Sequence, residues 1–184
     1  MNWLVVGILS WIALGMERGL KDAFQLGDSA IAPSFIVVLV VYIAAWARRP
    51  QALVLGLLIG LAADLLADHS TAPQGDVLTI VGPEAIGMLL AAYTVSIMRA
   101  WMLRSSSLAI GVMSIIACAV SGVLGLTLLK MHNMAEALAL GPASSELGQR
   151  MGTALYSGIV AVPLAMGLNF IRPLLGFSGD GRRG

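Results

Sequence analysis

Six apolar runs, separated by short clusters of charged residues and prolines, constrain this chain more than any other feature of its sequence. A run of about 20 apolar residues can cross a bilayer as an α-helix, which pairs all its backbone groups internally. Of the 184 residues, 58% are apolar and only 11% are charged, whereas soluble domains are about 25% charged. We therefore expect an all-α integral membrane bundle forming a single polytopic domain over residues 1–184. The expected spans are 3–20, 31–47, 51–67, 81–98, 105–129 and 151–171.

Two longer connections separate some of these spans. They are Asp68–Ile80 and Met131–Arg150. The second contains enough apolar residues for a short helix lying at the membrane interface, and a plain mobile loop is an equal alternative. Inside the last span, Pro163 predicts a kink, because proline cannot donate the helical hydrogen bond.

The basic residues predict how the chain is oriented in the membrane. If the N-terminus is cytoplasmic, the inner connections and tail hold seven arginines and the outer loops hold four basic residues. Because cytoplasmic loops carry the excess of Lys and Arg, both termini are expected in the cytoplasm. No basic cluster is dense enough to predict a nucleic-acid partner. The inner set is Arg48, Arg49, Arg99, Arg104, Arg172, Arg182 and Arg183, and the outer set is Arg18, Lys21, Lys130 and Arg150.

A row of residues at four-residue spacing marks the third span: Ala52, Gly56, Gly60, Asp64 and Asp68. Residues four apart lie on one helical face, and the Gly56-x3-Gly60 pair lets another backbone approach closely in lipid. An ionisable residue in a membrane helix is costly unless it faces protein or water. The functional hypothesis is that Asp64 orients a helix junction, a partner contact or a ligand. In the alternative, Asp64 lies roughly 21 Å from the cytoplasmic end of its helix and reaches headgroup water.

The same row raises the question of catalysis. Gly60-x3-Asp64-x3-Asp68 matches the second half of the signature of CDP-alcohol phosphotransferases, whose aspartates hold a divalent metal. The first half is missing, because residues 46–51 contain no aspartate. His69 and His132 are far apart in sequence, are expected in outer loops, and do not supply a metal site. With no nucleophile motif or phosphate loop either, the sequence predicts no enzyme, no metal and no cofactor.

The remaining spans differ in side-chain size. Small residues recur in the later spans, beginning with Gly87 and Ala91, and predict close helix packing within the monomer or with partner helices. In contrast, residues 35–43 are bulky and β-branched on all sides. That pattern predicts a helix facing lipid or a partner.

These features together resemble the rod shape-determining protein MreD family. The resemblance rests on Pro33 opening an apolar helix with Tyr42, then on Gly56-x3-Gly60-Leu61-x2-Asp64-Leu65, and then on Gly87 with Tyr93 before a basic cluster. It extends over nearly the whole chain, although the segment between Asp64 and Gly87 is longer than usual in the family. The candidate helix-junction or partner-binding residues are Gly56, Gly60, Asp64, Asp68, Gly87 and Tyr93.

The resemblance implies a non-catalytic membrane scaffold of the bacterial cell-elongation machinery, which regulates cell shape and peptidoglycan synthesis. The implied partners are an MreC-like periplasmic scaffold, an MreB-like filament, and the glycosyltransferase and transpeptidase of peptidoglycan synthesis. The implied fold is similar to the substrate-binding subunits of energy-coupling-factor vitamin transporters. Such a subunit, with an outward-facing ligand pocket, is therefore the alternative function. The expected location is the bacterial cytoplasmic membrane.

Overall fold

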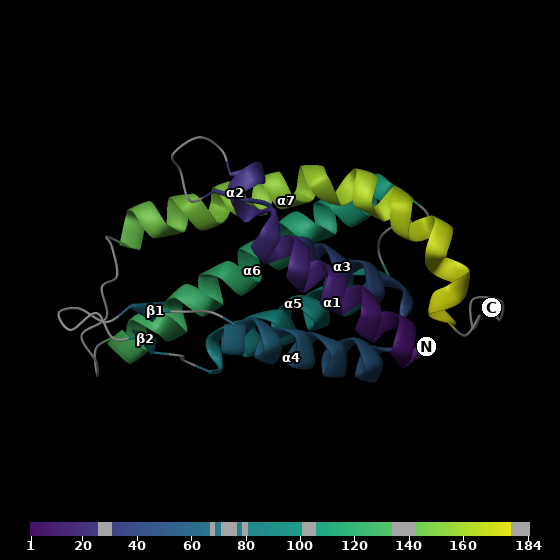
Figure 1. The fold of residues 1–184 in the computed structure, drawn as a ribbon, viewed down its shortest axis with the longest axis horizontal. Coiled ribbons are helices and arrows are strands. Elements are labelled where there is room, and N and C mark those ends of the chain that lie inside the picture. Colours follow the sequence, from purple (N-terminus) through teal and green to yellow (C-terminus); the bar gives the residue numbers. More distant parts are fainter. Residues whose placement is uncertain are drawn as a thin grey trace.

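The computed structural model describes residues 1–25, 31–66, 69–70, 77–78, 81–100, 106–133 and 143–177, and these form an all-α bundle, as expected. Two short strands, β1 (His69–Ser70) and β2 (Val77–Leu78), pair antiparallel in the connection between two helices. Figure 1 shows the arrangement of the helices. They are α1 (Trp3–Gly19), α2 (Lys21–Phe24), α3 (Phe35–Trp46), α4 (Arg49–Leu66), α5 (Pro83–Met98), α6 (Ser107–Asn133), α7 (Ala143–Ile171) and the 3-10 helix η1 (Arg172–Leu175).

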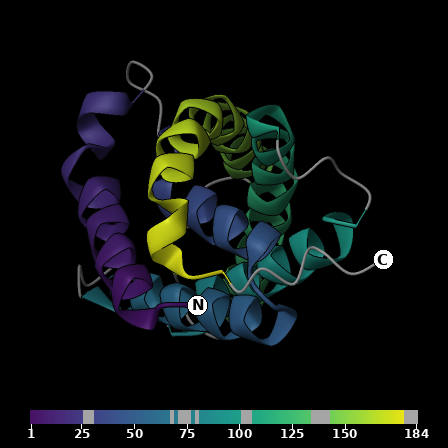
Figure 2. The same ribbon diagram turned by 90° about the vertical axis from the view of Figure 1, so that its right-hand side faces the viewer.

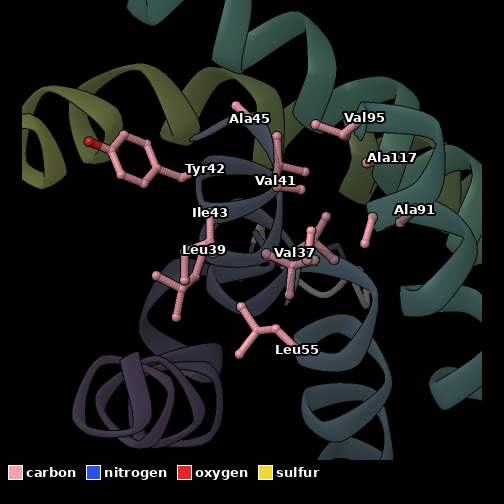
Figure 3. Close-up of a cluster of buried hydrophobic side chains, with 14 of the residues drawn as sticks. Val37, Leu39, Val41, Tyr42, Ile43, Ala45, Leu55, Ala91, Val95 and Ala117 are labelled. Carbon is pink, nitrogen blue, oxygen red and sulfur yellow. The ribbon is translucent and has the colours of Figure 1, made fainter. Parts of the chain in front are cut away.

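The central helix of the bundle is α3, which packs against α1, α4, α5, α6 and α7 (Figure 2). Every residue from Phe35 to Ala45 is buried. In Figure 3, Tyr42 and Val41 point to different sides of α3, so its whole circumference contributes to the core. The prediction that residues 35–43 face lipid or a partner is therefore wrong. A helix that is apolar on all sides suits the protein interior as well as lipid, and composition alone does not separate the two.

Within the described part of the chain, three helical segments are long and apolar enough to cross a membrane: Arg49–Leu66, Ser107–Leu128 and Ser145–Leu175. α3 and α5 are apolar but shorter. Large apolar side chains project from the outer helices, including Trp11 of α1, Ile159 of α7 and Phe170 of α7, which are 78%, 70% and 86% exposed. So much exposed apolar surface suits contact with a lipid bilayer.

The last two long helices differ from their expected bounds. α6 continues to Asn133, so His132 lies in a helix, and its prediction as a loop residue is wrong. α7 begins at Ala143, well before the expected start at 151. Its first turn contains Glu146, and an acidic residue suits the positive end of a helix although it interrupts an apolar run. The suggested interfacial helix lies largely in residues 134–142, outside the described residues.

The two ends of the described chain lie together. The backbone N–H of Asn2 donates to the carbonyl of Leu175 at 2.9 Å, which joins the start of α1 to η1. Figure 1 shows α7 curving over the other helices toward this point, with Pro163 inside it. At the other end of the bundle, the last turns of α1 lie beside the first turn of α3, where Glu17 contacts Ile36. The end of α4 likewise lies beside the start of α5, where Asp64 contacts Ala85. We call the end that holds these four helix termini the junction end.

Candidate functional site

The glycine row of α4 faces α5, and the two helices run antiparallel. Added at Gly56, a Cβ atom would lie 2.9 Å from the carbonyl oxygen of Met88 and 3.0 Å from the Cβ of Ala92. At Gly60 it would lie 2.5 Å from the Cα of Ala85. Real Cβ atoms do not approach backbone atoms so closely, so the two helices keep this separation only with glycine at these positions.

Asp64 continues the row at the junction end and is 1% exposed. Its Oδ2 accepts the backbone N–H groups of Gly82 at 2.9 Å and Ala85 at 3.0 Å, and its Oδ1 accepts that of Glu84 at 3.0 Å. The first N–H groups of a helix have no partner within the helix and form its positive end. The carboxylate of α4 therefore caps the N-terminus of α5 from another helix, and it does not reach headgroup water.

Gly82 makes this cap possible. Its φ of 134° lies in a region that residues with a Cβ rarely adopt, and the turn aims its N–H at Asp64. Pro83 then occupies the start of α5, where its missing N–H removes one donor that needs a partner. The sequence Gly82-Pro83-Glu84 thus begins α5 in a conformation whose backbone N–H groups can be capped by the Asp64 carboxylate of α4.

The other predicted site residues are not all brought to this contact. Gly87 faces α6, where an added Cβ would lie 3.1 Å from the carbonyl oxygen of Ser121. Tyr93, also on α5, is 48% exposed, whereas Ala85 and Met88 of the same helix are buried against the glycine row of α4. Asp68 lies outside the described residues. The structure therefore groups Gly56, Gly60 and Asp64 at one helix pair, with Gly87 at the next.

A second carboxylate caps a second helix at the same end. Glu17, in the last turns of α1, accepts the backbone N–H of Ile36 through Oε2 at 3.1 Å. Ser34 adds its own side chain, whose Oγ accepts the N–H of Val37 at 3.3 Å. The N–H of Ser34 in turn donates to the Oγ of Ser157 in α7 at 2.8 Å. α1, α3 and α7 thus meet around the start of the central helix.

An arginine connects the remaining helices at this end. The stem of Arg150 in α7 crosses α6 at Gly122, where an added Cβ would lie 3.5 Å from the Arg150 Cβ. Its Nη1 lies 3.8 Å from Oε1 of Glu84 at the start of α5. Both side chains are 30% exposed. The Glu84 backbone contacts Asp64, so a chain of polar contacts runs from α4 through α5 to α7.

These charged groups line a cavity of about 470 Å³ between α1, α3, α4, α5, α6 and α7. Leu14, Val37 and Met88 supply apolar lining, and Ser121 and Thr153 supply hydroxyl groups. Its charged lining residues are Glu17, Arg18, Glu84 and Arg150. The volume lies within the range of small-molecule sites, and the lining combines apolar walls with a few polar groups, as such sites do.

The opposite end of the bundle is held by arginines. Arg99, at the end of α5, donates to the carbonyl oxygens of Ala44 and Ala47 at the end of α3. The guanidinium carbon of Arg172 lies 3.6 Å from the centre of the Trp46 ring, a cation–π contact. Cations suit this end of α3 because its last carbonyl groups form the negative pole of the helix.

Sequence reasoning did not single out Glu17, Glu84 or Arg150 as site residues. Each is an ionisable residue next to or within an apolar run, which is the same pattern that marks Asp64. Their partners are distant in sequence, so spacing alone could not pair them. Among the residues that the structure describes, no three His, Cys, Asp or Glu residues are grouped as metal ligands would be. Both oxygens of Asp64 instead face backbone N–H donors.

The chain was compared with known proteins at three levels. No family model matches it. No curated protein and no solved structure matches it either.

Proposed function

We propose that this chain is a non-catalytic scaffold of the bacterial cell-elongation machinery, acting through partner membrane proteins in the manner of the MreD family. The observation that carries the proposal is the role of the Gly56-x3-Gly60-x3-Asp64 row in the contact between α4 and α5. The two glycines let the backbones of these helices approach closely, and the buried Asp64 carboxylate caps α5. A motif used wholly to fix helix positions supports a structural role.

The proposal includes a location and an orientation: a multi-pass protein of the cytoplasmic membrane with both termini in the cytoplasm. Arg99 and Arg172 contact the end of α3, and Arg48 and Arg49 follow α3 directly in sequence. Arg18 and Arg150 line the cavity at the junction end. This separation of arginines supports a cytoplasmic position for the end that carries Arg99, and an outer position for the junction end.

In this proposal the partners are the MreC-like periplasmic scaffold, the MreB-like filament and the enzymes of peptidoglycan synthesis. The rigid junction would hold α5 and α7 in fixed positions while the exposed apolar faces of the outer helices remain available to lipid or to partner helices. Exposed side chains such as Trp11 and Phe170 belong to these faces. The protein would thus act by positioning other membrane proteins.

The test is affinity purification of the tagged protein from its native membrane in mild detergent, with co-purifying proteins identified by mass spectrometry. An unrelated tagged multi-pass protein at the same level is the control. Recovery of the periplasmic scaffold and wall-synthesis enzymes is the expected result. Recovery of a transmembrane coupling subunit with paired ATPases would instead support the vitamin-transport alternative and contradict the proposal.

A further inference from the structure

The cavity at the junction end has a feature that the scaffold role does not require: among the residues that the structure describes, its lining carries charges of both signs in equal number. Glu17 and Glu84 contribute two carboxylates, and Arg18 and Arg150 contribute two guanidinium groups. Ionisable groups within a membrane bundle are costly to keep there, which makes them candidates for function. Three of these four groups make a structural contact, because Glu17 caps α3 and Glu84 pairs with Arg150. Neither task requires a cavity of about 470 Å³ between them.

The cavity opens to the surface. Arg18 and Leu66 line it and are exposed, and Glu84 and Arg150 each keep 30% of their side-chain surface accessible. The gap of 3.8 Å between Arg150 Nη1 and Glu84 Oε1 is longer than a charge-assisted hydrogen bond. Arg150 Nη1 and Glu84 Oε1 therefore do not form a close hydrogen-bonded pair with each other, and both side chains remain accessible from the cavity.

We propose that this cavity binds a small zwitterion that carries an ammonium group, an acidic group and an apolar body. The acidic group would meet Arg150 and Arg18, the ammonium group would meet the carboxylates of Glu17 and Glu84, and the apolar body would lie against Leu14, Val37 and Met88. A ligand with net charge would leave one lining charge without compensation on losing its water, which is costly in a partly buried site. A zwitterion replaces the water on charges of both signs.

This chemistry has two natural sources. One is a free solute of the amino-acid type, and the other is a phosphatidylethanolamine headgroup from the bilayer. The binding test uses the full-length protein in detergent, with thermal unfolding as readout, because a ligand that binds only the folded protein raises its melting temperature. The probes are the twenty L-amino acids and short-chain phosphatidylethanolamine.

Matched analogues of leucine test the charge requirement. 4-Methylpentanoate lacks the ammonium group, and 3-methylbutylamine lacks the carboxylate. Short-chain phosphatidylglycerol is the anionic control for the lipid probe. We expect a concentration-dependent rise in melting temperature with at least one zwitterion and none with the singly charged analogues. A rise with amino acids alone assigns a solute, and a rise with phosphatidylethanolamine alone assigns a lipid.

Two pairs of variants locate the binding. Thr153→Trp fills the cavity, whereas Leu155→Trp alters a side chain on the same helix that is 58% exposed. Arg18→Gln removes a charge at the cavity mouth without touching either cap, and Arg48→Gln removes an exposed arginine near the other end. The rise in melting temperature should disappear in Thr153→Trp, shrink in Arg18→Gln, and persist in both controls.

Three results would overturn the proposal. These are no rise with any zwitterion, an equal rise with a singly charged analogue, and an undiminished rise in both Thr153→Trp and Arg18→Gln. The scaffold role does not depend on the outcome, because partner recovery is measured separately and without added ligand.

Discussion

The carboxylate of Asp64, at the end of α4, accepts the backbone N–H of Ala85 at 3.0 Å in the first turn of α5. Glu17 and Ile36 repeat this relationship between α1 and α3. In both cases a carboxylate near the end of one helix accepts a hydrogen bond from a backbone N–H in the first turn of a later helix. A helix start within a membrane bundle has few water molecules to satisfy its N–H groups, so each cap fixes the helix ends as well as stabilising them.

Replacing Asp64 by Ala should lower the stability of the detergent-solubilised protein by about 2 kcal/mol, because three N–H groups lose an ionised acceptor. Asp64→Asn should cost less, since the amide keeps one acceptor oxygen. Thermal unfolding monitored by size-exclusion chromatography gives the order of the three proteins. An Asp64→Ala variant as stable as the wild type would contradict the cap.

Gly60→Ala and Gly15→Ala form a matched pair of helical substitutions. An added Cβ at Gly60 would lie 2.5 Å from the Cα of Ala85, whereas at Gly15 nothing lies within 4 Å. Alanine favours a helix over glycine by up to about 1 kcal/mol, so Gly15→Ala should be neutral or stabilising. Gly60→Ala should destabilise by about 1–3 kcal/mol despite that gain, because the packed backbone must move. Equal effects in the same unfolding assay would refute the close approach of α4 and α5.

Arg150 should stabilise the protein more through its stem than through its charge. The stem packs on Gly122, and the charged contact with Glu84 is long and partly exposed. Arg150→Met keeps most of the stem and should cost less than about 1 kcal/mol, as exposed ion pairs do. Arg150→Ala should cost more. If Arg150→Met is as unstable as Arg150→Ala, the ion pair contributes more than this geometry implies.

Part of this architecture could be predicted from the sequence. The apolar runs gave the positions of the main helices because lipid and protein interior both demand apolar residues. The spacing of Gly56, Gly60 and Asp64 indicated a shared face, since four-residue spacing has one geometric meaning in a helix. The membrane bundle is confirmed, whereas the function assigned from the family resemblance stays a proposal.

The position of α3 could not be predicted in the same way. In a soluble protein, polarity separates buried faces from exposed ones, but in a membrane bundle both are apolar. The two caps could not be predicted from the sequence for a different reason. Glu17 and Ile36 are 19 residues apart, and Asp64 and Ala85 are 21 residues apart, so only the fold brings each pair together.

The central claim, that the α4–α5 junction serves a scaffold, is tested most directly in cells whose own copy is replaced by Gly60→Leu or by Gly15→Leu. Partner recovery and cell width are measured together at matched levels of protein in the membrane. We expect Gly60→Leu to lose the periplasmic scaffold and to widen the cells, while Gly15→Leu, at a position with open space, retains both functions. Full partner recovery and normal width in Gly60→Leu cells would contradict the claim.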